Sequence, residues 1–448
     1  MIGGGKYDLL LVNGLVMSRS EDQVSPLMHG YVAVKDGVIA AVGPASELGP
    51  LEGAAQVIDA AGGLIMPGLV NGHVHCPMTL FRGLADDLPL MTWLTRHIFP
   101  AESAHVGEEL VYWGTKLACA EMLLSGTTCL ADGYFLEKHA ARAVLESGLR
   151  AVLGQGVIDF PAPGVPDPSR NIDAARDFIQ EWQGVSPLLS PSVFCHSPYT
   201  CSSETLVKAK ALARATGALF QIHVSETEAE VNRIKAEKGL RPVAYLDSLG
   251  LLDQSTLAVH CVHLDQAEID LLAERKTPVC VCVESQMKLA SGLAPLEALL
   301  KAGLEVALGT DGPASNNDLN MFGEMRSTAL LFKVAGLNPT ALPASQVLDL
   351  AGPRGAAALG FAGRIGSLLP GFRADVIVLD LDRPNLHPLY HPVSHLVYAA
   401  TGREVKTVMV NGRVLVRDGR FLAFDLEETM NRVREIARRI RAWDEARK

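Results

Sequence analysis

Eight short apolar runs, each rich in β-branched residues, follow one another through the middle of the chain, and most are separated by segments with helical patterning. Eight strands that alternate with helices over about 250 residues predict an α/β fold with a (β/α)8 TIM-type barrel. A doubly wound sheet has the same alternation, but no G-x-G-x-x-G or phosphate-binding loop opens any of these helices, which favours the barrel. The runs are Leu64–Val70, Thr127–Ala131, Ala151–Ile158, Leu189–Phe194, Ala218–Val224, Thr256–Val262, Pro278–Cys282 and Glu305–Leu308.

Both ends of the chain show a different pattern, in which short strands are joined by tight turns. Asn13-Gly14 and Asp36-Gly37 predict hairpins in the first part, and Asn411-Gly412 and Asp418-Gly419 predict hairpins in the last part. We therefore expect one small β-sandwich domain built from both chain ends, with a charged amphipathic helix over Leu426–Lys448 that docks on the surface. The expected divisions are residues 1–66, 67–366 for the barrel, and 367–448.

Composition limits the partners that this chain can have. Its net charge is −10, from 50 acidic and 40 basic residues without a long Lys/Arg run, which argues against a nucleic-acid partner. The eight scattered cysteines form no C-x-x-C and indicate reduced, buried thiols. The longest uncharged stretch, Gly62–Phe81, contains prolines, glycines and histidines and predicts no membrane span. We expect a cytoplasmic protein that binds no membrane.

Histidines gather where the predicted strands end. Catalytic groups of such barrels lie at the carboxyl ends of the strands, and six of the thirteen histidines fall at or beside these ends. Asp311 follows the eighth strand and Glu226 follows the fifth. The six histidines are His73, His75, His196, His223, His260 and His263.

Four of these residues have the chemistry and spacing of a metal site. In His73-Val74-His75 both imidazoles point to the same face of a strand, because side chains alternate along it. His223 and Asp311, from across the barrel mouth, would complete a set of three nitrogens and one oxygen that suits one Zn²⁺ and leaves a place for water. The same set also admits Fe²⁺ or Mn²⁺. No His-Glu-x-x-His, cytidine-deaminase-type zinc motif or Gly-x-Ser-x-Gly occurs.

The segments around these residues resemble the amidohydrolase superfamily, and the resemblance runs over essentially the whole chain. The fourth strand ends in His196, where binuclear members of the superfamily carry a lysine, so the chain is similar to the one-metal deaminase and chlorohydrolase branch. The motifs that carry the resemblance are Pro67–His75, Ile222–Glu226, Val259–His263, Gly309–Gly312 and Pro370–Asp375.

A closer resemblance is to the 5′-methylthioadenosine/S-adenosylhomocysteine deaminases. It implies that Glu102 accepts hydrogen bonds from both ribose hydroxyls, that Trp93 faces the substrate, and that His196 contacts the nucleoside. On other interpretations, Glu102 caps the helix that follows and Trp93 is packing in a lid. The segments that carry this resemblance are Leu80–Asp87, Phe99–Glu102 with Trp93, His196–Tyr199 and Gly309–Asn317.

Two positions depart from the pattern of that family. An arginine that can follow the third strand and hold a substrate carboxylate is matched by Gln155, with Arg170 as the candidate for a second such arginine. We expect both residues to line the substrate site, with a weaker preference for the charged homocysteine tail. The loop after the seventh strand reads Val283-Glu284-Ser285-Gln286 instead of Pro-x-Ser-Asn, which leaves the shape of that wall open.

The resemblance implies a metal-dependent hydrolytic deaminase that converts 5′-methylthioadenosine, S-adenosylhomocysteine or adenosine to the inosine analogue and ammonia. In this hypothesis Asp311 binds the metal and takes the proton of water, His260 hydrogen-bonds the attacking oxygen, and Glu226 contacts the purine and protonates it. The alternatives are a guanine or other aminoheterocycle deaminase, a triazine-type chlorohydrolase, and a barrel-shaped scaffold without activity. The resemblance further implies a homo-oligomer, either a dimer or a tetramer.

Overall fold

The eight predicted strands form a parallel sheet that curls into a barrel. The computed structural model describes residues 7–17, 19–20, 23–24, 28–48 and 53–447, and within these the sheet runs in chain order from β8 to β15. Its two edges meet where the Asp311 N–H donates to the His73 carbonyl at 3.0 Å. The barrel fold is therefore confirmed. The strands are β8 (Leu69–Val74), β9 (Thr127–Tyr134), β10 (Arg150–Val157), β11 (Leu189–Cys195), β12 (Phe220–Val224), β13 (Thr256–His260), β14 (Val279–Val281) and β15 (Val306–Leu308).

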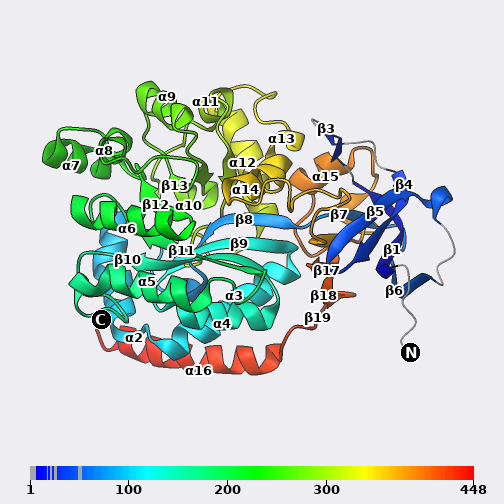
Figure 1. The fold of residues 1–448 in the computed structure, drawn as a ribbon, viewed down its shortest axis with the longest axis horizontal. Coiled ribbons are helices and arrows are strands. Elements are labelled where there is room, and N and C mark those ends of the chain that lie inside the picture. The colour runs from blue at the N-terminus through cyan, green and yellow to red at the C-terminus, as the bar shows by residue number, and fades with distance from the viewer. Residues whose placement is uncertain (1–6, 18, 21–22, 25–27, 49–52, 448) are drawn as a thin grey trace.

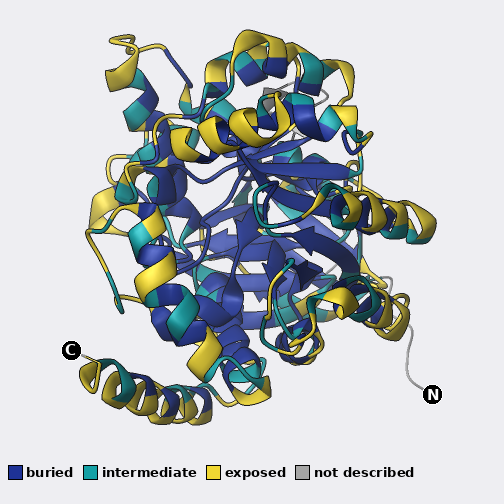
Figure 2. Cartoon of the chain, turned by 90° about the vertical axis from the view of Figure 1, so that its left-hand side faces the viewer, coloured by how far each residue is buried: buried dark blue, intermediate teal, exposed yellow. Residues whose placement is uncertain are grey.

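Helices surround this sheet on its outer side. Figure 2 shows fully buried strands inside a ring of helices whose outer faces are exposed, which is the amphipathic pattern expected for a layer between core and water. The helices that follow the barrel strands are α3 (Glu108–Leu124), α4 (Glu137–Ser147), α5 (Asn171–Trp182), α6 (Ser203–Thr216), α7 (Glu228–Lys238), α8 (Pro242–Ser248), α9 (Gln266–Glu274), α10 (Val283–Lys288), α11 (Leu296–Lys301), α12 (Met321–Ala335), α13 (Ala344–Leu350) and α14 (Pro353–Ala358).

The first predicted strand divides between two sheets, so the single run Leu64–Val70 was wrong. β7 (Leu64–Pro67) pairs with the strands of the chain ends, whereas β8 opens the barrel. The break falls at Gly68, where an added Cβ would lie 2.1 Å from the Thr128 hydroxyl oxygen, so that only glycine fits. Apolar periodicity could not show the break because both halves are buried.

The strands of both chain ends join in one nine-stranded mixed sheet within the described residues, at the right of Figure 1. It encloses its own apolar cluster, to which Leu9 and Val34 contribute from one chain end and Val376 and Met409 from the other. The strands are β1 (Tyr7–Val16), β4 (Met28–Lys35), β5 (Val38–Pro44), β6 (Ala54–Asp59), β7, β16 (Val376–Leu379), β17 (Val405–Val410), β18 (Arg413–Arg417) and β19 (Arg420–Phe421).

Three of the four predicted hairpins are present, and the one at Asn13-Gly14 was wrong. β1 continues through these residues, and its register against β4 shifts between Leu11 and Gly14. Asn13 has a φ of 56°, so the turn-forming pair makes a bulge inside one long strand. The turns at Asp36-Gly37, Asn411-Gly412 and Asp418-Gly419 connect paired antiparallel strands as predicted.

A segment of short helices lies between β8 and α3 and covers the barrel mouth. It contains η3 (Cys76–Phe81), α1 (Leu90–Thr92), η4 (Trp93–Ile98) and α2 (Phe99–His105). The C-terminal helix α16 (Leu426–Glu445) lies along the barrel next to α2 and α3 (Figure 1). Its Ile436 and Ile440 belong to one apolar cluster with residues of these short helices. The predicted amphipathic helix therefore docks as expected. No helix among the described residues is long and apolar enough to cross a membrane.

A buried ion pair joins the barrel to the terminal sheet. The Arg150 guanidinium, at the start of β10, donates to both oxygens of Asp375 at 2.7 and 3.0 Å. Both side chains are 1% exposed, and one oxygen of Asp375 also accepts the Asn411 N–H at 2.7 Å. Because neither charge can be solvated there, each depends on the other.

We expect Asp375→Ala to lower the apparent free energy of unfolding by about 3–5 kcal/mol, because it leaves the Arg150 guanidinium buried without its charge partner. Urea denaturation followed by circular dichroism measures this loss. Glu237→Ala is the matched control, since it removes the carboxylate of the exposed pair Arg233–Glu237 and should cost less than about 1 kcal/mol. Equal losses in the two variants would contradict the role of the buried pair.

Candidate active site

The four predicted metal ligands come together at the barrel mouth. His73 lies in β8 and His75 just beyond its end, His223 lies in β12, and Asp311 follows β15. The Nε2 atoms of His73 and His223 are 3.1 Å apart. The Asp311 Oδ1 lies 3.7 Å from the His73 Nε2 and 3.4 Å from the His75 Nε2. All four side chains are buried.

The arrangement of these donor atoms fits one divalent cation. Two nitrogens that bind one zinc ion tetrahedrally at about 2.0–2.1 Å lie about 3.3 Å from each other, close to the observed separation of His73 and His223. His75 Nδ1 donates to the Gly133 carbonyl at 2.6 Å, which leaves the lone pair of Nε2 facing the other ligands. Burial and the neighbouring imidazoles hold the pKa of His73 and of His223 well below the usual value, so both are neutral, as coordination requires.

Asp311 is held in place by three hydrogen-bond donors. Its Oδ2 accepts from the hydroxyls of Ser285 and Ser315 at 2.7 and 2.8 Å, and its Oδ1 accepts from the Gly312 N–H at 2.7 Å. Burial raises the pKa of this carboxyl, but the nearby imidazoles and Ser285 lower it by more, so Asp311 is ionised. Ser285 lies in α10, the segment that departs from the family pattern, and this departure therefore leaves the support of Asp311 intact.

The backbone is strained where these residues leave their strands. Ser225, His260, Cys261 and Asp311 have φ values of 54°, 74°, 50° and 61°, which residues other than glycine adopt at an energetic cost. Glu230 supports one of these turns, because its carboxylate accepts the N–H groups of Ser225 and Glu226 at 2.8 and 2.9 Å. The strain aims side chains of successive strands into one space, which is typical of a functional site.

A cavity of about 320 Å³ lies against the ligand cluster and contains the other predicted catalytic residues. The His260 Nε2 is 4.0 Å from the Glu226 Oε2, and both line the cavity beside Asp311. Burial, Asp311 and Glu230 raise the pKa of Glu226 well above the usual value, which favours the protonated form of this carboxyl. It can therefore act as an acid toward a bound ring.

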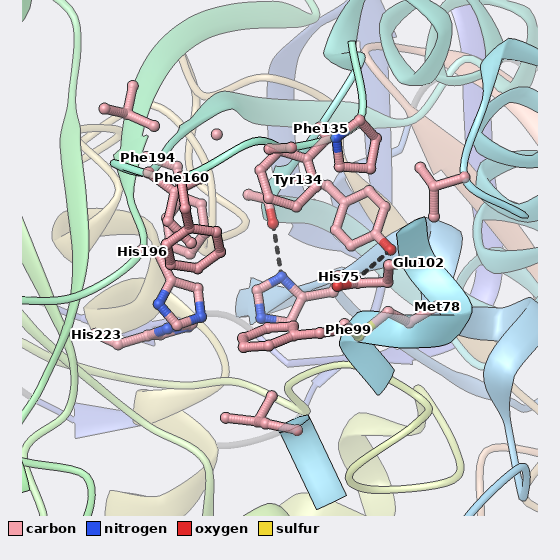
Figure 3. A pocket seen from close by; sticks show the side chains of 18 of the residues that line it. His75, Met78, Phe99, Glu102, Tyr134, Phe135, Phe160, Phe194, His196 and His223 are labelled. Carbon is pink, nitrogen blue, oxygen red and sulfur yellow. Dashed lines mark hydrogen bonds between the residues drawn. The ribbon is translucent and has the colours of Figure 1, made fainter. Parts of the chain in front are cut away.

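Three predicted substrate-binding residues also line this cavity, namely Trp93 and the two that Figure 3 labels, Glu102 and His196. Glu102, in α2, accepts a hydrogen bond from the Tyr134 hydroxyl at 2.6 Å, so its carboxylate does not cap the following helix. Burial raises the pKa of Glu102 to about 7, although the Tyr134 bond lowers it. His196 contacts the Thr200 hydroxyl through Nδ1 at 3.0 Å, and burial lowers its pKa to about 4. The Trp93 indole N–H donates to the Ala85 carbonyl at 3.1 Å.

The structure does not bring Gln155 and Arg170 into the cavity, which corrects the expectation that they line it. Gln155 points outward from β10 toward α4, where its Oε1 accepts the Glu137 N–H at 3.1 Å. The residues that follow it, Gly156 and Val157, line the cavity instead. The Arg170 side chain is 68% exposed and forms an ion pair with Asp173 at 3.0 Å. Neither residue is among the described residues that line the cavity.

Several residues of the site were missed by sequence reasoning. Tyr134, Ser285 and Ser315 support the acidic groups through their hydroxyls, and Phe99 and Phe160 form part of the cavity wall. Ser315 lies inside the motif Gly309–Asn317, so its nearness to Asp311 was available as a signal. Nothing in the sequence linked Tyr134 to Glu102, which lies 32 residues away on another element.

Comparison with known proteins agrees with this geometry. The model of the family described as "Amidohydrolase family" matches residues 64–415, which span β7 to β18 and include every ligand in the cluster. The chain belongs to the amidohydrolase family.

Similar sequences indicate where the chain belongs within this family. The chain is 48% identical over 442 residues to the 5-methylthioadenosine/S-adenosylhomocysteine deaminase of Syntrophobacter fumaroxidans, covering 98% of this chain and all of the relative. It is 43% identical over 440 residues to the 5′-deoxyadenosine deaminase of Methanosarcina mazei, covering 97% and 99% of the two chains. The expected place among the 5′-methylthioadenosine/S-adenosylhomocysteine deaminases is thus confirmed.

Solved structures show the same fold. An adenosine deaminase of Xanthomonas campestris with bound zinc is 40% identical and superposes with a TM-score of 0.93, covering 97% of this chain and 99% of the other. An atrazine chlorohydrolase of Arthrobacter aurescens, in complex with zinc, has a TM-score of 0.89 at 21% identity, covering 96% and 100%, and this likeness concerns the fold alone.

We expect this amidohydrolase, supplied with zinc, to hold about one ion per chain, and His223→Ala to lose most of it, because three donors bind far more weakly than four. Elemental analysis after gel filtration measures the content. His263→Ala is the control, since His263 follows β13 at the same end of the barrel, but its Nε2 contacts the Ser291 carbonyl at 2.6 Å. Full zinc content in His223→Ala would overturn the ligand set.

Proposed function

We propose that this chain is a metal-dependent hydrolytic deaminase of adenine nucleosides, which converts 5′-methylthioadenosine and related 5′-substituted adenosines to the inosine analogue and ammonia. The observation that carries the proposal is the convergence of a neutral-imidazole and carboxylate cluster with Glu226 and His260 on one cavity. The printed names of relatives at 43–48% identity support an adenine nucleoside as the substrate. A chain that releases no ammonia from any adenine nucleoside would refute it.

The metal ligands in this proposal are His73, His75, His223 and Asp311. They suit Zn²⁺, the ion bound in the similar adenosine deaminase structure. A zinc ion held by such a set lowers the pKa of water to about 7 and so supplies a nucleophile at neutral pH. The complete ligand set argues against an inactive scaffold.

The protein groups carry the protons of the reaction. Glu226, which burial keeps protonated, gives its proton to a purine ring nitrogen and makes C6 more electrophilic. His260 orients the attacking water, and Asp311 takes one of its protons as the oxygen bonds to C6. Asp311 then passes that proton to the amine, the C6–N bond breaks and ammonia leaves. The proton on the new C6 oxygen returns to Glu226, which restores the enzyme.

Three further groups that line the cavity hold the nucleoside in this proposal. Glu102 is the acceptor for the ribose hydroxyls, and Trp93 and His196 contact the nucleoside from two further walls of the cavity. A buried carboxylate is a reason to favour a ribose-bearing substrate over a free base or a triazine, which have no vicinal hydroxyls to donate to it. The guanine deaminase and triazine hydrolase structures share the fold at 21–23% identity and lend no support to those reactions.

We further propose that the protein acts in the cytoplasm and as a homo-oligomer. All eight cysteines lie in the described part of the chain as buried free thiols, which suits a reducing compartment. The oligomer stays a prediction from the family resemblance.

Glu226→Gln should keep its zinc while kcat for 5′-methylthioadenosine falls by about 10²–10⁴-fold, because the amide cannot donate the required proton. An ammonia-coupled assay on enzyme of measured zinc content tests this. Glu228→Gln, on the exposed side of the same turn, is the matched control and should retain activity. A fully active Glu226→Gln enzyme would remove Glu226 from the mechanism.

The cavity should prefer a neutral 5′ substituent to a zwitterionic one. Among the described residues that line it there is no lysine or arginine, and much of the wall is apolar, as at Phe99, Phe160 and Pro163. The carboxylate of S-adenosylhomocysteine would find no cationic partner there, whereas a methylthio group would pack well. We expect kcat/KM for 5′-methylthioadenosine to exceed that for S-adenosylhomocysteine by at least about 10-fold, a difference of about 1.4 kcal/mol.

Steady-state kinetics on both substrates measures this ratio. Ala162→Arg, which adds a cation to the cavity wall, should move the ratio toward S-adenosylhomocysteine, and Ala162→Leu is the control for added bulk without charge. An equal or higher kcat/KM for S-adenosylhomocysteine in the unaltered enzyme would contradict the expectation.

A further inference from the structure

Tyr134 contacts the proposed ribose-binding residue directly. It is the last residue of β9, it lines the cavity, and its hydroxyl donates to the Glu102 Oε1 at 2.6 Å (Figure 3). Within the described part of the chain, this hydroxyl is the one hydrogen-bond partner recorded for the Glu102 side chain. The bond therefore decides where the Glu102 carboxylate lies.

Tyr134 is itself fixed more firmly than Glu102. Its N–H donates to the Glu137 Oε1 at 3.2 Å, and its ring is 3% exposed and packs beside Phe135 at a centroid separation of 5.5 Å. Its position belongs to the barrel, whereas Glu102 belongs to α2, one of the short helices that cover the mouth. The hydroxyl thus ties a side chain of the covering segment to the rigid sheet.

We propose that Tyr134 is a positioning residue for ribose recognition, which holds one oxygen of Glu102 so that the other faces the vicinal hydroxyls of the nucleoside. This rests on the proposed function. An ionised carboxylate has about four acceptor positions, so one bond from Tyr134 leaves enough for two ribose hydroxyls. A carboxylate whose orientation is already set loses less conformational freedom when the nucleoside binds.

The test is Tyr134→Phe in the zinc-loaded enzyme, which removes the hydroxyl and keeps the ring. For adenosine we expect kcat/KM to fall by about 10-fold or more, mainly through KM, because a hydrogen-bonded charged acceptor has lost its anchor. For 2′,3′-dideoxyadenosine, which offers no hydroxyl to Glu102, the same variant should change kcat/KM by less than about 2-fold. A general disturbance of the cavity would lower kcat/KM for both substrates by the same factor.

Two further variants make the outcome decisive. Tyr112→Phe removes a comparable bond outside the cavity, which the Tyr112 hydroxyl in α3 donates to Glu146 in α4 at 2.7 Å. It should leave the ratio of kcat/KM for adenosine to that for dideoxyadenosine unchanged. In a Glu102→Gln background, adding Tyr134→Phe should cost little more, since Tyr134 acts through Glu102.

An unchanged ratio in Tyr134→Phe, or full additivity of the two substitutions, would overturn the proposal. Ammonia release by the unaltered enzyme tests the deaminase function separately, so failure of one idea is not mistaken for failure of the other. If Tyr134→Phe does not fold, the ratio of kcat/KM for adenosine to that for 2′,3′-dideoxyadenosine in Glu102→Gln is the deciding measurement. An unchanged ratio there would overturn the proposal, because Tyr134 would then have no ribose acceptor to position.

Discussion

Four donor groups that face one another in the barrel mouth set the central constraint on this structure. Three imidazoles and one carboxylate are buried close together, with 3.1 Å between the Nε2 atoms of His73 and His223 and 3.4 Å between the His75 Nε2 and the Asp311 Oδ1. Such a cluster is costly to bury unless a cation satisfies it. Burial lowers the pKa of His73 and of His223, and the hydroxyls of Ser285 and Ser315 donate hydrogen bonds to Asp311. The site is thus prepared for a divalent ion before any substrate arrives.

The same constraint explains where the backbone is strained and how the barrel closes. Asp311 has a left-handed conformation, and its N–H bonds to the carbonyl of His73, so one residue both joins the sheet edges and presents a ligand. Ser225 and His260 have left-handed conformations at the ends of the strands β12 and β13. Each strained turn is supported by bonds in the surrounding sheet, which is how a fold maintains costly conformations at a site.

Sequence reasoning could find the ligand cluster because barrel geometry brings all strand ends to one mouth, so that position along the chain predicts position in space. It failed where the orientation of a side chain, or its neighbours in space, determines whether the residue reaches the site. Gln155 and Gly156 are adjacent in the sequence but face opposite sides of β10, and no local pattern in a fully buried strand tells which faces inward. Asn13-Gly14 is typical of a turn, but pairing between β1 and β4 keeps these residues within a strand. Arg170 forms an ion pair with Asp173 on the surface.

The two ends of the cavity are built by different physical means. The end that contains His73, His75, His223 and Asp311 is built where the barrel strands end. The end that contains Glu102 is formed by short helices that cannot bury their own apolar faces, so they need support from elsewhere. That support comes from α16, where the Trp443 ring lies 5.0 Å from His105 of α2 and Arg439 pairs with Glu109 at 2.6 Å. The last helix of the chain therefore supports the segment that carries Glu102, although more than three hundred residues separate the two in the sequence.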